Sequence, residues 1–211
     1  MTETFSLPDG YHALPPGKLA NLVTFLEITE RPDRPRRPAP AGYALEPVER
    51  WDTDAFLDLY REIGWEWLWS SRLLMPREKL EAKLAAPHMR SWCPVKEGRR
   101  LGIVEMDLST AYETEISFFG LVPDAVGGGI GGWMMREAID IAFARPGVTR
   151  LWLHTCHFDS PQALPFYMHM GFTPYARAVE VHDDVRLLGR LDESAGPHVP
   201  LIKNGRLPNL G

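Results

Sequence analysis

Cysteine is scarce in this sequence, and long apolar runs are absent. Only two of the 211 residues are cysteines, Cys93 and Cys156, and each lies in a strand-like run. This usage predicts reduced, buried thiols and excludes a fold held together by disulfide bonds. No run of about eighteen apolar residues occurs, and residues 1–6 contain no basic segment followed by an apolar one. We therefore expect a cytoplasmic protein that does not span a membrane.

An excess of positive charge is also lacking. The chain has 23 lysines and arginines against 28 acidic residues, which gives a net charge of −5. No overall basic field would attract nucleic acid or an anionic membrane, whereas an amine substrate would be tolerated. With 45% hydrophobic residues the chain can fill one core, and its length predicts one domain with extensions.

The most informative segment is rich in glycine. Residues 126–132 read Val-Gly-Gly-Gly-Ile-Gly-Gly, between an apolar strand predicted at 116–122 and an amphipathic helix predicted at 131–144. Glycine permits positive φ and close approach to a ligand, and the free N–H groups of a helix N-terminus attract anions. The junction predicts a site for a pyrophosphate, with a turn that binds nothing as the alternative.

Two other phosphate-binding motifs fit this segment poorly. Gly127, Gly129 and Gly132 have the spacing of a dinucleotide fingerprint, but about half the chain precedes them. That motif places an acidic residue about twenty positions later, where residues 150–154 read Arg-Leu-Trp-Leu-His. A Walker A loop requires Gly-Lys-Ser/Thr, and Trp133 follows the last glycine here.

A second motif follows the glycine-rich segment after one helix and one strand. Residues 151–156 read as a strand and residues 159–172 as a short helix that ends in Gly-Phe. The two segments together resemble the GNAT superfamily of N-acetyltransferases over about residues 43–182. The family loop (Gln/Arg)-x-x-Gly-x-Gly/Ala is matched by residues 126–131, although Val126 replaces the polar first residue. The family segment Ala-x-x-x-Tyr-x-x-x-Gly-Phe is matched by Ala163, Tyr167, Gly171 and Phe172.

The resemblance implies a fold, a donor and a binding surface. The implied fold is α/β, with a mixed, mostly antiparallel sheet splayed at a central bulge near Gly120 and flanked by helices on both faces. The implied co-substrate is acetyl-CoA, without a metal. Ser160 stands where the family often has Asn, and its hydroxyl can cap the helix and bond the cofactor arm. The implied donor-binding residues are Leu121, Val122, Val126, Gly127, Gly128, Gly129, Ile130, Gly131, Gly132, Ser160, Ala163 and Tyr167.

Two residues are candidates for catalysis. Glu115 begins the strand that leads into the glycine-rich segment, and in the histone-acetylating branch of the family a Glu near this position is the general base. A solvated carboxylate is the alternative. Tyr167 lies on the apolar stripe of its helix, and the resemblance makes it the acid for the departing thiolate, with core packing as the alternative. Pro165 interrupts the same helix, and a backbone N–H near Leu121 is implied as the oxyanion donor.

The acceptor is expected to meet a tryptophan-rich segment, residues 64–72. Trp65, Trp67 and Trp69 could wall a pocket, Glu66 could attract an amine, and His154 could border the site; packing under a loop is the alternative. We expect a small-molecule or peptide amine as acceptor and allow for a homodimer. A catalytically silent acyl-CoA-binding sensor or scaffold, and a thioester hydrolase, remain open as alternative functions.

Three regions are expected along the chain. Residues 1–42 form an N-terminal extension with an added edge strand at 19–29 and an exposed linker at 31–40, which holds four prolines and four arginines. Residues 43–182 form the acetyltransferase domain, and residues 183–211 form a C-terminal tail that is expected to lie loosely on the surface from Asp192 onward. Further helices are expected at 53–63, capped by Asp52, and at 76–85, and further strands at 43–48, 90–95, 101–108, 113–122 and 176–181.

Overall fold

The computed structural model describes residues 7–35 and 37–209, so parts of the expected extension, linker and tail (1–6, 36 and 210–211) lie outside the described residues. The strands are β1 (Lys18–Ile28), β2 (Tyr43–Val48), β3 (Met89–Lys96), β4 (Arg99–Arg100), β5 (Gly102–Asp107), β6 (Glu113–Leu121), β7 (Arg150–Cys156) and β8 (Thr173–Asp183). The helices are α1 (Thr53–Gly64), α2 (Ser71–Leu74), α3 (Arg77–Leu84), α4 (Ile130–Phe143) and α5 (Ala163–His169), with a 3₁₀ turn at Pro123–Ala125.

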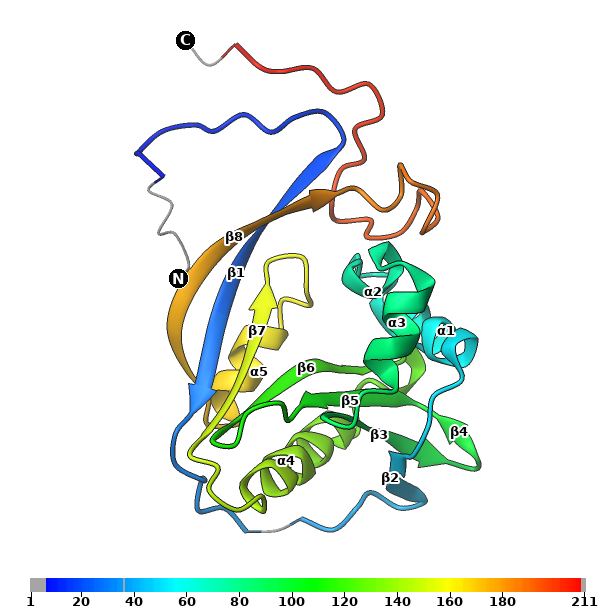
Figure 1. Ribbon diagram of the computed structural model, residues 1–211, viewed down its shortest axis with the longest axis vertical. Coiled ribbons are helices and arrows are strands. Elements are labelled where there is room, and N and C mark those ends of the chain that lie inside the picture. The colour runs from blue at the N-terminus through cyan, green and yellow to red at the C-terminus, as the bar shows by residue number, and fades with distance from the viewer. Residues whose placement is uncertain (1–6, 36, 210–211) are drawn as a thin grey trace.

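All eight strands belong to one sheet (Figure 1). Their order is β2-β3-β5-β6-β7-β1-β8, with β4 paired to β3. Neighbouring strands are antiparallel except β6 and β7, which are parallel. The expected α/β fold with a mixed, mostly antiparallel sheet is confirmed. In the part of the chain that the structure describes, no helix is long and apolar enough to cross a membrane.

The helices cover both faces of the sheet and enclose two cores. One core lies under α1, α2 and α3, where Phe56 and Tyr60 are almost fully buried. The other lies under α4 and α5, where Met134 and Met170 are buried. Figure 1 shows α3 and α4 on opposite sides of β5 and β6. The sequence predicts α1 well, because the Asp52 carboxylate accepts hydrogen bonds from the N–H groups of Asp54 (3.1 Å) and Ala55 (2.9 Å).

The first strand is not at the edge of the sheet, which corrects the sequence prediction. β1 lies between β7 and β8 and is antiparallel to both. β8 is the edge strand instead, and with β1 it forms the long curved arm of Figure 1. The buried side chains of Val23, Leu26 and Ile28 show that β1 contributes to the core. Its apolar, β-branched composition predicted a strand, but a single strand's composition does not reveal its neighbours.

The tail after β8 is packed against the protein as far as Val199, so the expectation of a loose tail from Asp192 onward is wrong for this part. Arg186 forms a buried ion pair with Asp184 (2.7 Å) and donates hydrogen bonds to the carbonyls of Ala195 and Val199. These contacts satisfy charges that would otherwise be costly to bury. The N–H of Gly196 also donates to the carbonyl of Trp65 (3.0 Å). The tail therefore covers the tryptophan-rich segment.

The sheet opens between β6 and β7, at a different residue from the one predicted. The two strands pair only over Glu113 to Ile116, and β6 then continues alone beside β5. Glu105 of β5 faces Phe118 while Met106 faces Ile116, so Ser117 is the extra residue of a bulge. The splay therefore begins at Ser117, not at Gly120.

Gly120 has a different role from the predicted one. A Cβ atom at this position would lie 2.5 Å from Ile63 and 2.9 Å from Trp69. Only glycine lets β6 pack this closely against α1 and the tryptophan-rich segment.

Candidate functional site

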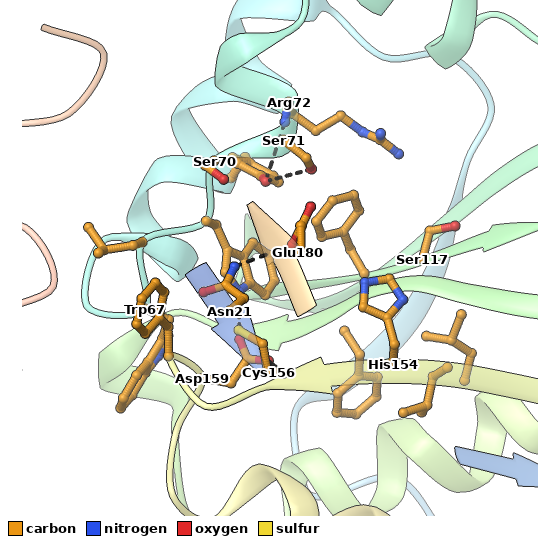
Figure 2. Close-up of a pocket in the computed structure, with 18 of the residues that line it drawn as sticks. Asn21, Trp67, Ser70, Ser71, Arg72, Ser117, His154, Cys156, Asp159 and Glu180 are labelled. Atoms are coloured by element: carbon orange, nitrogen blue, oxygen red, sulfur yellow. Dashed lines mark hydrogen bonds between the residues drawn. The ribbon is translucent and has the colours of Figure 1, made fainter. Parts of the chain in front are cut away.

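A cavity of about 310 Å³ lies where β6 and β7 separate. Its walls come from the segment before α2, from β6 and β7, and from the β1–β8 arm, as Figure 2 shows. The residues that line it include Asn21, Trp67, Trp69, Arg72, Lys83, Glu115, Ser117, Phe118, Phe119, His154, Cys156, Asp159, Tyr167 and Glu180.

The bulge at Ser117 decides which side chains share a face of β6. In a regular strand, alternate residues point the same way, so Glu115 and Phe118 would face opposite sides. The extra residue puts Phe118 in the core under α1, whereas Ile116 and Phe119 pack in the core under α4 and α5. Glu115 and Phe118 consequently lie on the same side of the sheet.

Glu115 is half-buried at the edge of this cavity. Burial raises its pKa, with a smaller contribution from the nearby carboxylate of Asp107, while His154, Lys83 and Arg72 act in the opposite direction. A carboxylate with a raised pKa is a better proton acceptor near neutral pH than a solvated one. The geometry and environment fit a general base.

Tyr167 lines the same cavity from α5 and is only 8% exposed. Burial raises its pKa, and the charge of Asp159 raises it further, so the hydroxyl keeps its proton at neutral pH. Pro165 does not disturb this placement. It is the third residue of α5, where the N–H it lacks would have no partner within the helix. The predicted helix at 159–172 is shorter than expected and begins at Ala163.

The glycine-rich segment forms an exposed loop that ends at the N-terminus of α4. Gly127, Gly128 and Gly129 have φ values of 104°, 58° and 80°, which other residues rarely adopt. A Cβ atom on any of the three would meet no heavy atom within 4 Å, so the loop is open on its outer side. Gly129 is the N-cap of α4 and supplies no side-chain cap, which leaves N–H groups of the first turn available to an anion.

The remaining predicted donor-binding residues differ in the groups that they can offer to a ligand. Val126 is 71% exposed, whereas the side chains of Val122 and Ile130 are buried, so these two can offer only backbone groups to a ligand. Leu121 and Ala163 are half-buried. Ser160 does not cap α5, whose N-cap is Gln162; the Ser160 hydroxyl accepts a weaker bond from the N–H of Gln162 (3.3 Å) in the turn before the helix. Gly131 and Gly132 lie in the first turn of α4.

Only some of the predicted acceptor-binding residues line the cavity. Trp67, Trp69 and His154 line the cavity. Trp65 packs against the core under α1, and Glu66 is exposed outside the cavity. The tryptophan-rich segment therefore both lines the cavity and packs in the core. Trp69 does both, since the centre of its ring also lies 5.2 Å from the ring centres of Tyr60 and Phe118.

A buried ion pair in the cavity wall was not predicted. Arg72 of α2 pairs with Glu105 of β5, and their side chains are only 6% and 1% exposed. The guanidinium of Arg72 also lies over the ring of Phe118, 4.6 Å from its centre. One signal existed in the sequence: Glu105 interrupts an otherwise apolar run, and a buried charge requires a partner.

Asp159, Asn21 and Glu180 are further cavity residues whose place in the site was not predicted. Asp159 accepts hydrogen bonds from the Thr155 hydroxyl (2.7 Å), the Cys156 N–H (2.9 Å) and the Trp69 indole (3.3 Å). These bonds hold the turn after β7 against the tryptophan-rich segment. Asn21 and Glu180 come from β1 and β8, and no local motif connects them with the site.

In its described residues, the structure does not favour a cysteine nucleophile or a metal ion in this site. Cys156 is a free thiol in the cavity wall, and burial raises its pKa to about 12, so it stays protonated at neutral pH and is a poor nucleophile. Within residues 7–35 and 37–209, no three His, Cys, Asp or Glu side chains are grouped to hold a metal ion.

Comparisons with known proteins agree with this geometry. The model of the acetyltransferase (GNAT) family matches residues 49–172. No curated protein matches the sequence significantly.

Solved structures share the fold at low identity. A GCN5-related N-acetyltransferase from Sphaerobacter thermophilus is similar at a TM-score of 0.59 and 18% identity, over 82% of this chain and 53% of its own. A GCN5-related N-acetyltransferase from Kribbella flavida is similar at a TM-score of 0.53 and 18% identity, over 79% of this chain and 60% of its own. An aminoglycoside acetyltransferase from an uncultured soil metagenomic sample, in complex with sisomicin, is similar at a TM-score of 0.53 and 14% identity. The match covers 66% of this chain and 93% of that protein. The chain thus spans between half and two thirds of the first two proteins.

Proposed function

The chain belongs to the GNAT acetyltransferase family, and we propose that it transfers an acetyl group from acetyl-CoA to a primary amine by direct attack in a ternary complex. One observation carries the proposal: β6 lines a cavity that contains both Glu115 and Tyr167, separates from β7 after Ile116, and leads directly into the open glycine loop. Acetyl-CoA would supply the acyl thioester.

The residues present fit such a donor. The three glycines with positive φ leave open space beside the first turn of α4, where N–H groups and the helix dipole favour a pyrophosphate. Val126 offers no polar side chain, so the backbone N–H groups carry the interaction. Beyond Ile116, the side of β6 that faces away from β5 is not paired with β7, so its backbone groups are available to a ligand arm.

Glu115 would accept the proton of the acceptor ammonium, directly or through water. An amine attacks only when its lone pair is free, and the raised pKa of Glu115 brings this carboxylate closer to the range in which a base is effective. A backbone N–H of residues 117–121, with Leu121 as the expected donor, would stabilise the developing oxyanion.

Tyr167 would donate a hydrogen bond to the departing sulfur. Its hydroxyl is protonated at neutral pH because its pKa is raised by burial. A thiol has a pKa of about 8.5, so complete proton transfer from such a tyrosine to a thiolate is uphill. The group therefore acts best as a hydrogen-bond donor that stabilises the leaving thiolate while solvent supplies the proton.

A titration of acetyl-CoA into the purified protein tests the donor. The informative variant is Gly132→Glu, with Gly132→Ala as its control. Position 132 is helical and a Cβ atom there meets nothing within 4 Å, so both variants should fold. A carboxylate beside the bound pyrophosphate should weaken binding about a hundredfold, whereas alanine should leave it nearly unchanged.

The outcomes separate the alternative functions. Binding lost in Gly132→Glu, together with amine-dependent release of free thiol, supports the acetyltransferase. Binding without thiol release, with or without amines, indicates a silent acyl-CoA sensor or scaffold. Thiol release that is independent of amine indicates thioester hydrolysis, and absence of binding by the native protein rejects the proposal.

A further inference from the structure

The wall of the cavity formed by the β1–β8 arm carries Asn21 and Glu180, which the proposed reaction does not use. We propose that these two residues bind a second cationic nitrogen of the acceptor, so that the substrate is a diamine or a larger polyamine. This inference rests on the proposed function, because it concerns the acceptor of the same reaction.

Asn21 presents an unsatisfied acceptor. The residue is 6% exposed, and its amide nitrogen lies 3.3 Å from the Glu180 carboxylate and 3.1 Å from Nε2 of His182. The carboxylate fixes the orientation of the amide, because only the nitrogen can donate to it. The amide oxygen is then buried, with no hydrogen-bond partner among the described residues. Buried polar atoms normally have a partner, so this oxygen calls for a donor from a ligand.

Glu180 supplies the negative charge. Figure 2 shows its carboxylate beside the Asn21 amide, and both residues line the cavity. Among residues 7–35 and 37–209, no basic side chain forms an ion pair with it, and its hydrogen bond comes from the neutral amide of Asn21. An ammonium ion is the donor that would satisfy both the carboxylate and the amide oxygen.

The other charged groups of the cavity support a ligand with two amines. Arg72 is tied to Glu105, and Asp159 is occupied by three hydrogen bonds. Lys83 contributes the remaining permanent positive charge. Glu115 and Glu180 are therefore the two carboxylates available to a substrate, one for the reacting nitrogen and one for a second nitrogen. Trp67 and Trp69 add aromatic surface, which favours cationic ligands.

The experiment compares linear diamines, from propane-1,3-diamine to octane-1,8-diamine, with the monoamine of the same length. Thiol release is measured at saturating acetyl-CoA. We expect kcat/KM for the best diamine to exceed that of its monoamine about tenfold, since a charged hydrogen bond contributes roughly that factor. Glu180→Gln should remove this preference by raising KM for the diamine towards that for the monoamine.

Two further variants keep the test decisive. Glu66→Gln is the matched control, because Glu66 is an exposed carboxylate outside the cavity. It should keep the preference. Asn21→Leu, which removes the amide oxygen, should also lower the preference. If its melting temperature shows that it is unfolded, Glu180→Gln alone decides.

The two hypotheses fail in different ways. Equal kcat/KM for diamines and monoamines in the native protein, or a preference that survives Glu180→Gln, overturns the inference and leaves the acetyltransferase intact. If acetyl-CoA binds but none of these amines reacts, calorimetric titration of each amine into the CoA complex decides, and equal affinities overturn the inference. If acetyl-CoA itself does not bind, the proposed function fails first.

Discussion

The proposed donor end of the site and its proposed acceptor end are built in opposite ways. The donor end uses backbone groups of one continuous stretch, from β6 through the glycine loop and α4 to α5. The acceptor end uses side chains from β1, the segment before α2, β6, β7 and β8, which are as far apart in sequence as Asn21 and Glu180. We therefore expect donor binding to depend on local chain conformation, and acceptor recognition to depend on the packing of the whole protein.

The glycines at the two ends show the same contrast. Gly127, Gly128 and Gly129 are needed for their positive φ and face open space. Gly64 and Gly120 have ordinary φ but are closely packed, since a Cβ atom on either would lie within 3 Å of Trp69. Substitutions at the donor end should therefore change binding with little loss of stability, and substitutions at the acceptor end should change both.

The largest effect is expected from removing the buried charge of the acceptor end. Arg72→Met would leave Glu105 buried without its partner, and we expect the free energy of unfolding to fall by about 3–5 kcal/mol. Urea denaturation measures this loss.

The double variant Arg72→Met/Glu105→Leu is the control for the buried pair. It should recover most of the stability, because removing both charges leaves neither unpaired. If Arg72→Met lowers the free energy of unfolding by less than about 1 kcal/mol, the buried ion pair contributes no more than an exposed one. The contrast between the two ends would then be lost.

The next largest effect concerns the base. Glu115→Gln should lower kcat about 100-fold to 1000-fold at neutral pH, within the range typical of general bases, with little change in acetyl-CoA affinity. Because the pKa of Glu115 is raised, the native kcat/KM should fall with decreasing pH through a value above the usual range for glutamate. The glutamine variant should lack this acid limb, which a pH profile measures. A profile with the same limb in both proteins would assign the proton transfer to another group.

The local structure of the proposed donor end was largely predictable from the sequence, for a physical reason. The glycine loop, the N-terminus of α4 and the Asp52 cap of α1 depend on conformational preferences of a few adjacent residues, which a local pattern records. The helix containing Tyr167 was also predicted, although its first residue was misplaced. The helix begins at Ala163, because the residues before it form a turn in which the Ser160 hydroxyl accepts a hydrogen bond from the N–H of Gln162.

The acceptor end could not be predicted in the same way. The place of β1 between β7 and β8, the bulge at Ser117 and the pairing of Arg72 with Glu105 all depend on contacts between distant segments. Trp65, Glu66, Trp67 and Trp69 are neighbours in sequence, yet only two of them reach the cavity. Composition indicated an aromatic pocket, but the tertiary packing decides which side chains form it.

The smallest effect is expected at Tyr167, where the two ends meet. Tyr167→Phe should lower kcat about tenfold, since it removes one hydrogen bond to the leaving sulfur. Acetyl-CoA affinity and the melting temperature should stay nearly unchanged. The ring still packs against Phe119 and Phe172, and no described residue forms a hydrogen bond with the hydroxyl.

Single-turnover kinetics and thermal unfolding of the same Tyr167→Phe preparation measure both quantities. An unchanged kcat would make Tyr167 a core residue only. A lower melting temperature together with a lower kcat would instead mean that the hydroxyl supports the structure. In that case the donor end, like the acceptor end, would depend on the packing of the core, because Tyr167 lies in the core under α4 and α5 as well as in the cavity wall.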